Sequence, residues 1–370
     1  MKNIMKSTIT CLLLFLGLTV AYSQEFPFGT AKWDVSAEGA SAEVFKGKSS
    51  LYLYQGKARL QDFEFFTGIL EYDIYVTERR GFPGIRFRIQ DEGNWEEFYI
   101  RPHQSGNPDA NQYTPVFNGL AAWQLYFGPR FSTAYAYQFD AWNHVKLVVT
   151  ENELEVYIND MDTPMLTVDE LKHAKKPGAI ELYAGGPSGF RMADLKVTKM
   201  ANPTIKGKAK QNEPLPEGLI ESWSVSNAFD EQSLEGVTEL SKQNQSGLSW
   251  QTVAAEERGY ANLARVAVQR PKQNTVFAKV TIESDRKQVK KLYYGLSDRG
   301  TLFLNGQALA SGYNEFRSQD YRHLGTIGFN DAVYLPLKKG TNELWVAVSE
   351  NFGGWAVMGA FENTEGIKVE

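Results

Sequence analysis

The sequence predicts an all-β protein made of two domains. Apolar and polar residues alternate in short runs, such as Phe66–Val76 and Glu96–Arg101, and a period of two is typical of half-buried strands. Residues 219–370 lack long amphipathic helical periods, and Asp169–Lys176 is the one helical turn expected in the first half. The 13% of aromatic residues and the 32 glycines also favour a β-rich chain.

Residues 1–23 have the pattern of a signal peptide. Lys2 and Lys6 precede an apolar run, Ile9–Val20, that is short for a membrane span. Ala21–Ser23 supplies small residues at the two positions that a signal peptidase reads. We therefore expect cleavage before Gln24.

Composition limits the partners of the exported chain. The only cysteine, Cys11, lies at the start of the apolar run rather than at its end, which argues against a lipid anchor and leaves no disulfide. The whole sequence has a formal net charge of −5, and loss of Lys2 and Lys6 with the leader makes the exported chain more acidic, which argues against nucleic acid as a partner. No later segment is apolar enough to cross a membrane, so we expect a periplasmic, cell-surface or secreted protein.

The chain that remains is long enough for two domains. We place the first at residues 24–200, a linker at 201–217 and the second domain at 218–370. The linker segment is rich in Pro, Lys and small polar residues and has no apolar period.

Strand-like motifs in the first domain follow a familiar order. They read GILEYD at 68–73, WNHVKLV at 142–148, EVYIN at 155–159 and GFRMADLKV at 189–197. This order resembles the concanavalin A-like lectin and glucanase sandwich, also called the laminin G-like fold, over about residues 26–199. The resemblance implies a jelly-roll sandwich. It does not choose between lectin, glycosidase, lyase and adhesion module.

The second domain carries another set of turn and strand motifs. They are DRGTLFLNG at 298–306, VYLPLKKGTNEL at 333–344 and GGW at 353–355. This pattern resembles a galactose-binding-domain-like β-jelly roll of the kind attached to carbohydrate-active enzymes. The resemblance implies fold more than ligand contacts.

Candidate ligand-binding residues are densest between Arg80 and Gly128. Strands at Ile85–Gln90 and Glu96–Arg101 alternate so that charged and aromatic side chains share the face opposite the core, and Trp123–Phe127 reads as a third strand. A long loop, 102–119, adds polar residues. The predicted ligand-binding residues are Arg86, Arg88, Glu97, Tyr99, Arg101, His103, Asn118 and Trp123. The alternative is a salt-bridged sheet face without a ligand.

Catalysis by carboxylates is the second possibility for this domain. Glu71 and Asp73 fit the first two acids of the Glu-x-Asp-x-Glu motif of one glucanase family with this fold, but the third acid comes only at Glu78, so the same-face triad is broken. The candidate catalytic acids are Glu71, Asp73 and Glu97. The alternative is that they are polar positions of half-solvated strands.

The remaining candidates are metal ligands in the first domain and ligand-binding residues in the second domain. The four histidines lack zinc-site spacing. Asp109 and Asn111 offer oxygen ligands of the kind that calcium prefers, with loop hydrogen bonding as the alternative, and no other cofactor is expected. In the second domain the candidates are Arg317, Asp320, Tyr321 and Trp355; here the alternatives are an arm that packs on the first domain or a capped loop.

Taken as a whole, these patterns predict non-catalytic recognition of a glycan. Two alternatives stay open: an enzyme that acts on glycosidic bonds with acids of the concave face, and an adhesion or structural module that binds protein.

The leader generates the first testable prediction. Because residues 1–23 read as a cleaved signal peptide, material secreted by an expressing cell should begin at or near Gln24 and carry no lipid. Intact-mass spectrometry measures this directly. A mature chain that keeps Met1 would contradict the prediction.

Overall fold

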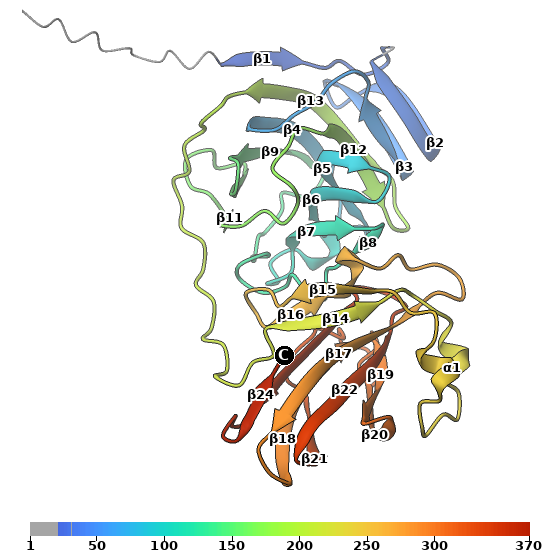
Figure 1. The fold of residues 1–370 in the computed structure, drawn as a ribbon. Coiled ribbons are helices and arrows are strands. Elements are labelled where there is room, and N and C mark those ends of the chain that lie inside the picture. Colours follow the sequence, from blue (N-terminus) through green and yellow to red (C-terminus); the bar gives the residue numbers. More distant parts are fainter. Residues whose placement is uncertain (1–20, 31) are drawn as a thin grey trace, which may run out of the picture.

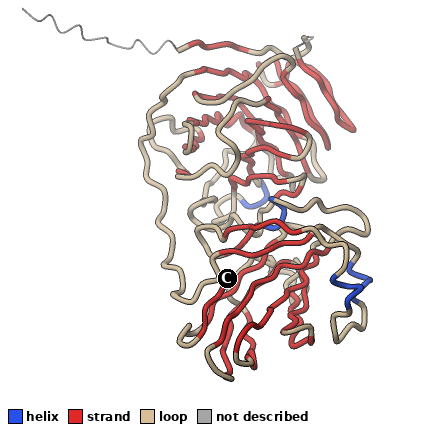
Figure 2. The backbone as a smooth tube through the Cα atoms, viewed as in Figure 1, coloured by secondary structure: helices blue, strands red, loops and turns tan. Residues whose placement is uncertain are grey.

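Strands make up most of the regular structure of this protein. The computed structural model describes residues 21–30 and 32–370 (Figures 1 and 2). Among these residues the only α-helix is α1 (Lys242–Gln245), which confirms the all-β class. No helix in the described part of the chain is long and apolar enough to cross a membrane. The predicted signal peptide lies almost entirely outside the described residues.

The first thirteen strands form one curled antiparallel sheet. Its order is β11-β10-β9-β4-β13-β3-β12-β5-β6-β7-β8, with β1 beside β13 and β2 beside β3. The strands are β1 (Tyr22–Glu25), β2 (Trp33–Phe45), β3 (Lys48–Leu60), β4 (Gly68–Val76), β5 (Phe82–Asp91), β6 (Asn94–Ile100), β7 (Asn111–Phe117), β8 (Leu120–Ala121), β9 (Ala141–Val149), β10 (Leu154–Ile158), β11 (Leu166–Val168), β12 (Ala179–Gly185) and β13 (Phe190–Lys199).

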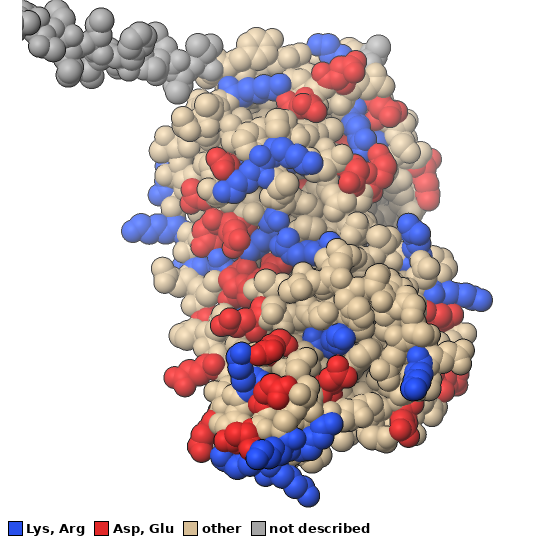
Figure 3. Space-filling model, viewed as in Figure 1, with Lys and Arg blue, Asp and Glu red and all other residues tan. Residues whose placement is uncertain are grey.

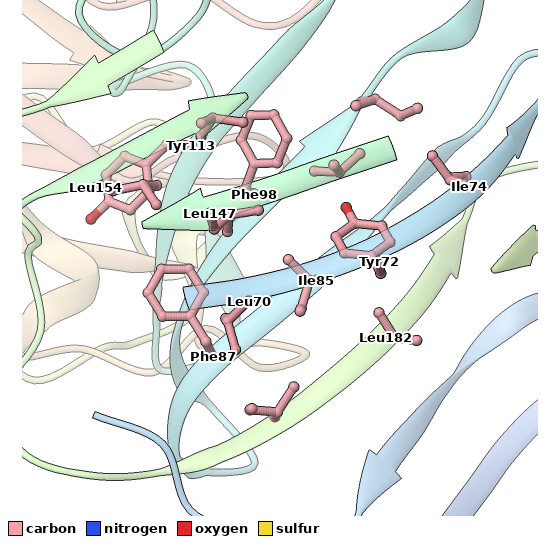
Figure 4. Close-up of a cluster of buried hydrophobic side chains, with 14 of the residues drawn as sticks. Leu70, Tyr72, Ile74, Ile85, Phe87, Phe98, Tyr113, Leu147, Leu154 and Leu182 are labelled. Carbon is pink, nitrogen blue, oxygen red and sulfur yellow. The ribbon is translucent and has the colours of Figure 1, made fainter. Parts of the chain in front are cut away.

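Strand β3 divides this sheet into two halves that face each other. Its residues 50–53 pair with β13, and its residues 56–59 pair with β12. We call β11, β10, β9, β4 and β13 half-sheet A, and β12, β5, β6, β7 and β8 half-sheet B. Side chains of both halves meet in one core, where Leu70 and Tyr72 of β4 lie among Ile85 and Phe87 of β5 (Figure 4). Each half therefore has an inner face in the core and an outer face turned away from it.

The remaining strands form a second sandwich. A seven-stranded sheet has the order β15-β14-β17-β22-β19-β20, with β24 beside β17, and a four-stranded sheet has the order β16-β23-β18-β21. Apolar side chains of both sheets form one core cluster. The strands are β14 (Ser222–Ser226), β15 (Trp250–Ala254), β16 (Tyr260–Asn262), β17 (Thr275–Ser284), β18 (Gln288–Ser297), β19 (Arg299–Leu304), β20 (Gln307–Tyr313), β21 (Asp331–Leu337), β22 (Gly340–Ser349), β23 (Ala356–Phe361) and β24 (Ile367–Val369).

The expected helical turn at Asp169–Lys176 is absent. This segment is irregular, because side chains of the sheet satisfy its backbone donors in place of helical carbonyls. The backbone N–H of Lys172 donates to the Tyr113 hydroxyl (3.1 Å), and that of His173 donates to a Glu96 carboxylate oxygen (2.9 Å). Local propensity is overridden by these long-range bonds.

Two further expectations near the centre of the first domain were wrong. The predicted loop 102–119 contains strand β7, and the predicted strand Trp123–Phe127 is a turn. In that turn the N–H groups of Leu125 and Tyr126 both donate to the carbonyl of Ala122 (3.0 and 3.1 Å). The N–H of Gln124 donates to Gly353 of the second sandwich (2.9 Å), so contacts with the other domain select the turn.

The two sandwiches share a packed interface. Tyr260 and Met358 of the second sandwich belong to the same apolar cluster as the core of the first. Beside them the hydroxyl of Tyr126 lies 2.9 and 2.8 Å from the two carboxylate oxygens of Glu256, which also accepts from Arg265 (2.8 Å). The contact is therefore both apolar and hydrogen-bonded.

The first part of the connection between the sandwiches, around residues 206–207, is hydrogen-bonded to the first sandwich. No helix or strand occurs between Lys199 and Ser222 (Figure 1). The carboxylate of Glu155, fully buried on β10, accepts the backbone N–H groups of Lys206 (2.7 Å) and Gly207. Residues 210–217, in contrast, are all exposed.

This difference predicts the order of proteolysis. Trypsin should cleave after Lys210 before it cleaves after Lys206, and Glu155→Ala should remove this order. Two hydrogen bonds to a carboxylate stabilise the closed segment by about 1–3 kcal/mol. Their loss should make local opening, and therefore cleavage after Lys206, about tenfold faster. Mass spectrometry of timed digests measures both rates. Glu151→Ala, which removes an exposed carboxylate in the turn between β9 and β10, is the control. Unchanged cleavage after Lys206 in Glu155→Ala would show that Glu155 does not hold this segment.

Candidate functional site

A row of charged side chains crosses the outer face of half-sheet B. Strand pairing places Arg59 opposite Glu181, Glu181 opposite Arg86, Arg86 opposite Glu97, and Glu97 opposite Thr114. Directly paired residues on one face lie close enough to interact. Interspersed charges of both signs are also visible over the surface in Figure 3. We call Arg59, Glu181, Arg86 and Glu97 the charged row.

Arg86 is the centre of the charged row. Its Nε lies 3.3 Å from Glu97, and its Nη1 lies 3.4 Å from Glu181. Its guanidinium also lies 4.2 Å from the ring centre of Tyr183 and 4.6 Å from that of Trp95. The side chain remains 21% exposed, so a planar cation held by two acids and two rings is accessible from solvent.

The two carboxylates of the row are almost completely buried. Glu181 is 1% exposed and also accepts from Arg59 (2.6 Å), with Lys57 at 3.3 Å. Glu97 is 5% exposed and accepts from Nε1 of Trp95 (2.9 Å). Burial raises the pKa of Glu97, against the opposing effect of the nearby guanidinium.

A second, more aromatic row runs beside the first. Pairing aligns Tyr183 with Gly84 and Gly84 with Tyr99. A side chain at Gly84 would lie 2.8 Å from Cβ of Tyr99, so only glycine lets the strands approach here. The ring of Phe82 packs edge-on against Tyr99 (6.2 Å) and His103 (5.5 Å). The outer face of half-sheet B thus joins rings to fixed polar groups.

Arg101 is a buried residue that holds Tyr99 of this face by a hydrogen bond. It is 7% exposed, and it donates to the carbonyl of Asp109 (2.8 Å), to the Tyr99 hydroxyl (2.7 Å) and to the amide oxygen of Gln112. The Gln112 amide in turn donates to the carbonyl of Trp123 (2.9 Å). Burial raises the pKa of Tyr99 to about 12, so its hydroxyl stays protonated. Arg101 and Tyr99 hold the loop and the sheet together, and a ligand would reach them only in part.

His103 lies at the rim of the same face. It is half-buried against Phe82, and burial, followed by the charges of Arg80 and Arg101, lowers its pKa. The imidazole is therefore neutral at physiological pH and can donate or accept one hydrogen bond.

Arg88 does not share this face, contrary to the expected alternation. Strand β5 bulges after Phe87, and Arg88 has a φ of +52°. The bulge turns its side chain inward, where it is fully buried and donates to the carbonyls of Phe66 (2.9 Å), Thr150 and Glu151 (3.1 Å). A buried bulge of this kind makes Arg88 a structural residue.

Asn118 and Trp123 lie at the contact between the domains. Asn118 has a φ of +52° in the β7–β8 turn, and its amide donates to the carbonyl of Ala264 (2.8 Å). The half-buried ring of Trp123 packs against Phe316 (5.8 Å) and Phe352 (5.7 Å) of the second sandwich. These two residues are thus separated from the charged row.

The second-domain candidates do not form one site. Arg317, Asp320 and Tyr321 are exposed on a loop, with Tyr321 76% exposed. Trp355 is fully buried, and its Nε1 donates to the carbonyl of Val348 (3.0 Å). Trp355 is therefore a core residue and not a surface for ligands.

Glu71 and Asp73 share the outer face of half-sheet A. His144 lies between them, with Nδ1 2.6 Å from Asp73 and Nε2 3.6 Å from Glu71. Asp73 also pairs with Lys48. Hydrogen bonds to Asp73 and then Glu71 raise the pKa of His144 to about 9, so this cluster is an ion-paired sheet face.

The three candidate acids are therefore not brought together. Glu97 points away from the core on half-sheet B, whereas Glu71 and Asp73 point away from it on half-sheet A. Glu78 follows the end of β4 and is exposed. Acids on opposite outer faces cannot flank one glycosidic bond.

Asn111, one of the two residues proposed for calcium, already has protein partners for its side chain. The Asn111 amide donates to the carbonyl of Thr133 (2.8 Å), and its oxygen accepts the Thr133 N–H (3.2 Å). The described residues contain no group of three or more His, Cys, Asp or Glu side chains suited to a metal ion. The structure thus shows the loop hydrogen bonding that was the alternative for Asn111.

Sequence reasoning missed Glu181, Tyr183 and Arg59. All three alternate with core residues along β12 and β3, so the signal was present. What was not visible was the pairing of β3 with β12 and of β12 with β5, which places Glu181 and Tyr183 beside Arg86 and Arg59 beside Glu181.

Fold and site together define a two-sandwich β protein with a polar and aromatic outer sheet face. No protein-family model and no curated protein matches the chain. Among solved structures it is similar to the carbohydrate-binding module CBM66 from Bacillus subtilis (12% identity, 47% of this chain and 96% of that one, TM-score 0.32). It is also similar to a Bacillus licheniformis β-glucanase (12%, 49% and 98%, 0.34) and to a Bacillus subtilis protein of unknown function with a galectin-like fold (13%, 49% and 96%, 0.37). None of these likenesses assigns a role to a residue of this chain.

The His144 cluster predicts a pH dependence of stability. Because the folded pKa of about 9 exceeds the ordinary 6.5, the stabilisation is complete below about pH 6.5 and is lost as the pH rises through 9. The side chain is 38% exposed, so solvent screening reduces the effect to roughly 1 kcal/mol. Urea unfolding at pH 6.5 and 9.5 should show this loss in the parent and not in His144→Gln. Equal losses in both proteins would contradict it.

Proposed function

We propose that the protein binds carbohydrate on the outer face of half-sheet B and does not cleave it. The observation that carries this proposal is the environment of Arg86, a partly exposed guanidinium fixed between two carboxylates and two rings. Rings offer a platform for the apolar face of a sugar, and fixed polar groups bond its hydroxyls. Since these groups are already held in place, little ordering is needed on binding.

The position of Arg86 also favours binding over hydrolysis. Hydrolysis of a glycoside needs the scissile bond between two carboxylates. Arg86 interacts with both Glu97 and Glu181 and thereby occupies the space between them. A sugar above this row would meet the guanidinium before it met the acids.

Hydrolysis is the second candidate, and one observation favours it. Burial raises the pKa of Glu97, and a raised carboxyl pKa is one property of a general acid. Glu181, which contacts Arg86 from the neighbouring strand, would then be the second carboxylate. Assays for reducing ends released from polysaccharides, with Glu97→Gln as the control, distinguish the candidates: release that Glu97→Gln abolishes supports the enzyme.

The binding proposal makes a prediction about two matched tryptophans. Trp95 and Trp142 are both half-buried on outer sheet faces, Trp95 beside Arg86 and Trp142 on half-sheet A. Loss of a stacking ring typically costs about 1–3 kcal/mol, so Trp95→Ala should weaken glycan binding about tenfold or more. Trp142→Ala should bind like the parent.

A glycan array with the mature protein selects the ligand, and calorimetry then measures each variant. The proposal fails if Trp95→Ala binds like the parent while it remains folded. An array without any bound glycan would favour the protein-binding alternative.

A further inference from the structure

A cavity lies where the two sandwiches and their connection meet. Its walls come from residues 127–131 of the first sandwich, 211–216 of the connection, and Arg258, Tyr260, 327–329 and Met358 of the second sandwich. Its volume is about 410 Å³. Ligand pockets typically measure about 300–1,000 Å³ and often lie at domain interfaces. The cavity is separate from the charged row.

Aromatic rings form much of the wall. Phe127 and Phe131 line it from the first sandwich, and Tyr260 and Phe329 line it from the second. Tyr260 and Phe131 both pack edge-on against the buried Tyr126, at 5.8 and 5.4 Å. The wall is therefore fixed by the domain interface and suits a ligand with a ring.

Arg258 supplies a positive charge that no acidic side chain among the described residues pairs with directly. Its Nη1 donates to the carbonyl of Phe127 (3.1 Å), and its guanidinium lies 3.8 Å from the centre of that ring. Arg258 forms no ion pair with any residue that the structure describes, and burial lowers its pKa. Arg130 in the same wall is different, because Asp169 and Glu257 (3.1 Å) neutralise it. Glu257 and Glu213 act on Arg258 only at longer range, so its guanidinium is still open to a direct ion pair with an anion in the cavity.

Tyr260 adds an unsatisfied donor to the same wall. Its side chain is fully buried, and its hydroxyl has no hydrogen-bond partner among the described residues. Buried hydroxyls are nearly always paired in native proteins. Because the Tyr260 side chain lines the cavity, a ligand there that displaced the wall slightly would offer its hydroxyl a partner.

We propose that this cavity binds a small carboxylate carried on a ring, with Arg258 as its counter-ion and Tyr260 as a hydrogen-bond donor. Two sources share this chemistry: an acidic sugar such as a uronate, and an aromatic acid. Glu213 of the connection also lines the cavity and is exposed. Its carboxylate weakens the binding of an anion and favours release.

Calorimetric titration of the full mature chain with glucuronate and with benzoate tests the proposal. Glucose is the neutral match for glucuronate. At least one carboxylate should bind, and glucose should bind at least tenfold more weakly or not at all. Tighter binding of glucuronate would identify the ligand as an acidic sugar, and tighter binding of benzoate would identify it as an aromatic acid.

Variants then locate the site. Arg258→Gln should weaken carboxylate binding at least tenfold, Tyr260→Phe should weaken it severalfold, and Glu213→Gln should strengthen it. Trp95→Ala should leave it unchanged, because that residue belongs to the other face, so the two proposals fail independently. Circular dichroism confirms that each variant is folded. Equal binding of glucose and glucuronate, no binding of either carboxylate, or parental affinity in a folded Arg258→Gln variant would overturn the proposal.

Discussion

The change of partner along β3 is the constraint on which the first sandwich depends. One stretch of this strand pairs with β13 and the next pairs with β12. Between them Gln55 has a φ of +44°, and a side chain on Gly56 would overlap Ala37 of β2. A kink followed by a residue without a side chain lets one strand turn the corner between two half-sheets. Because this corner sets which face of each half-sheet packs against the other half, it also determines which side chains lie in the core.

The same corner positions the first residue of the charged row, Arg59. Arg59 lies just beyond the kink, so its guanidinium reaches Glu181 on β12, which in turn reaches Arg86 on β5. Alternating charges on adjacent strands compensate one another, and this allows Glu181 to be buried at 1% exposure on an outer face. Removal of one member would leave a neighbour unpaired. The charged row is therefore held in place before any ligand binds. Such preorganisation helps a site to select among sugars that differ only in the positions of their hydroxyl groups.

The strand class and much of the outer-face assignment could be predicted from the sequence. Alternation alone placed Glu97 and Tyr99 away from the core, because the period of two survives wherever a strand is regular. It failed at Arg88, where a bulge reversed the face, and at Trp123, where contacts with the second sandwich selected a turn. Both failures are non-local. A bulge depends on the partner strands, and a turn at a domain contact depends on residues more than two hundred positions away, such as Gly353.

The domain interface links the cavity to the arrangement of the whole chain. Burial and the nearby Glu256 raise the pKa of Tyr126 well above its ordinary value, so its hydroxyl remains a donor to that carboxylate. The ring of Tyr126 also supports two aromatic walls of the cavity. A molecule in the cavity touches both sandwiches and their connection, so it binds only when all three are docked. By mass action such a ligand stabilises the docked arrangement by about 2.7 kcal/mol at a hundredfold excess over its Kd. Residues 210–217 of the connection are all exposed, and residues 211–216 line the cavity, so a ligand there would add contacts to this segment.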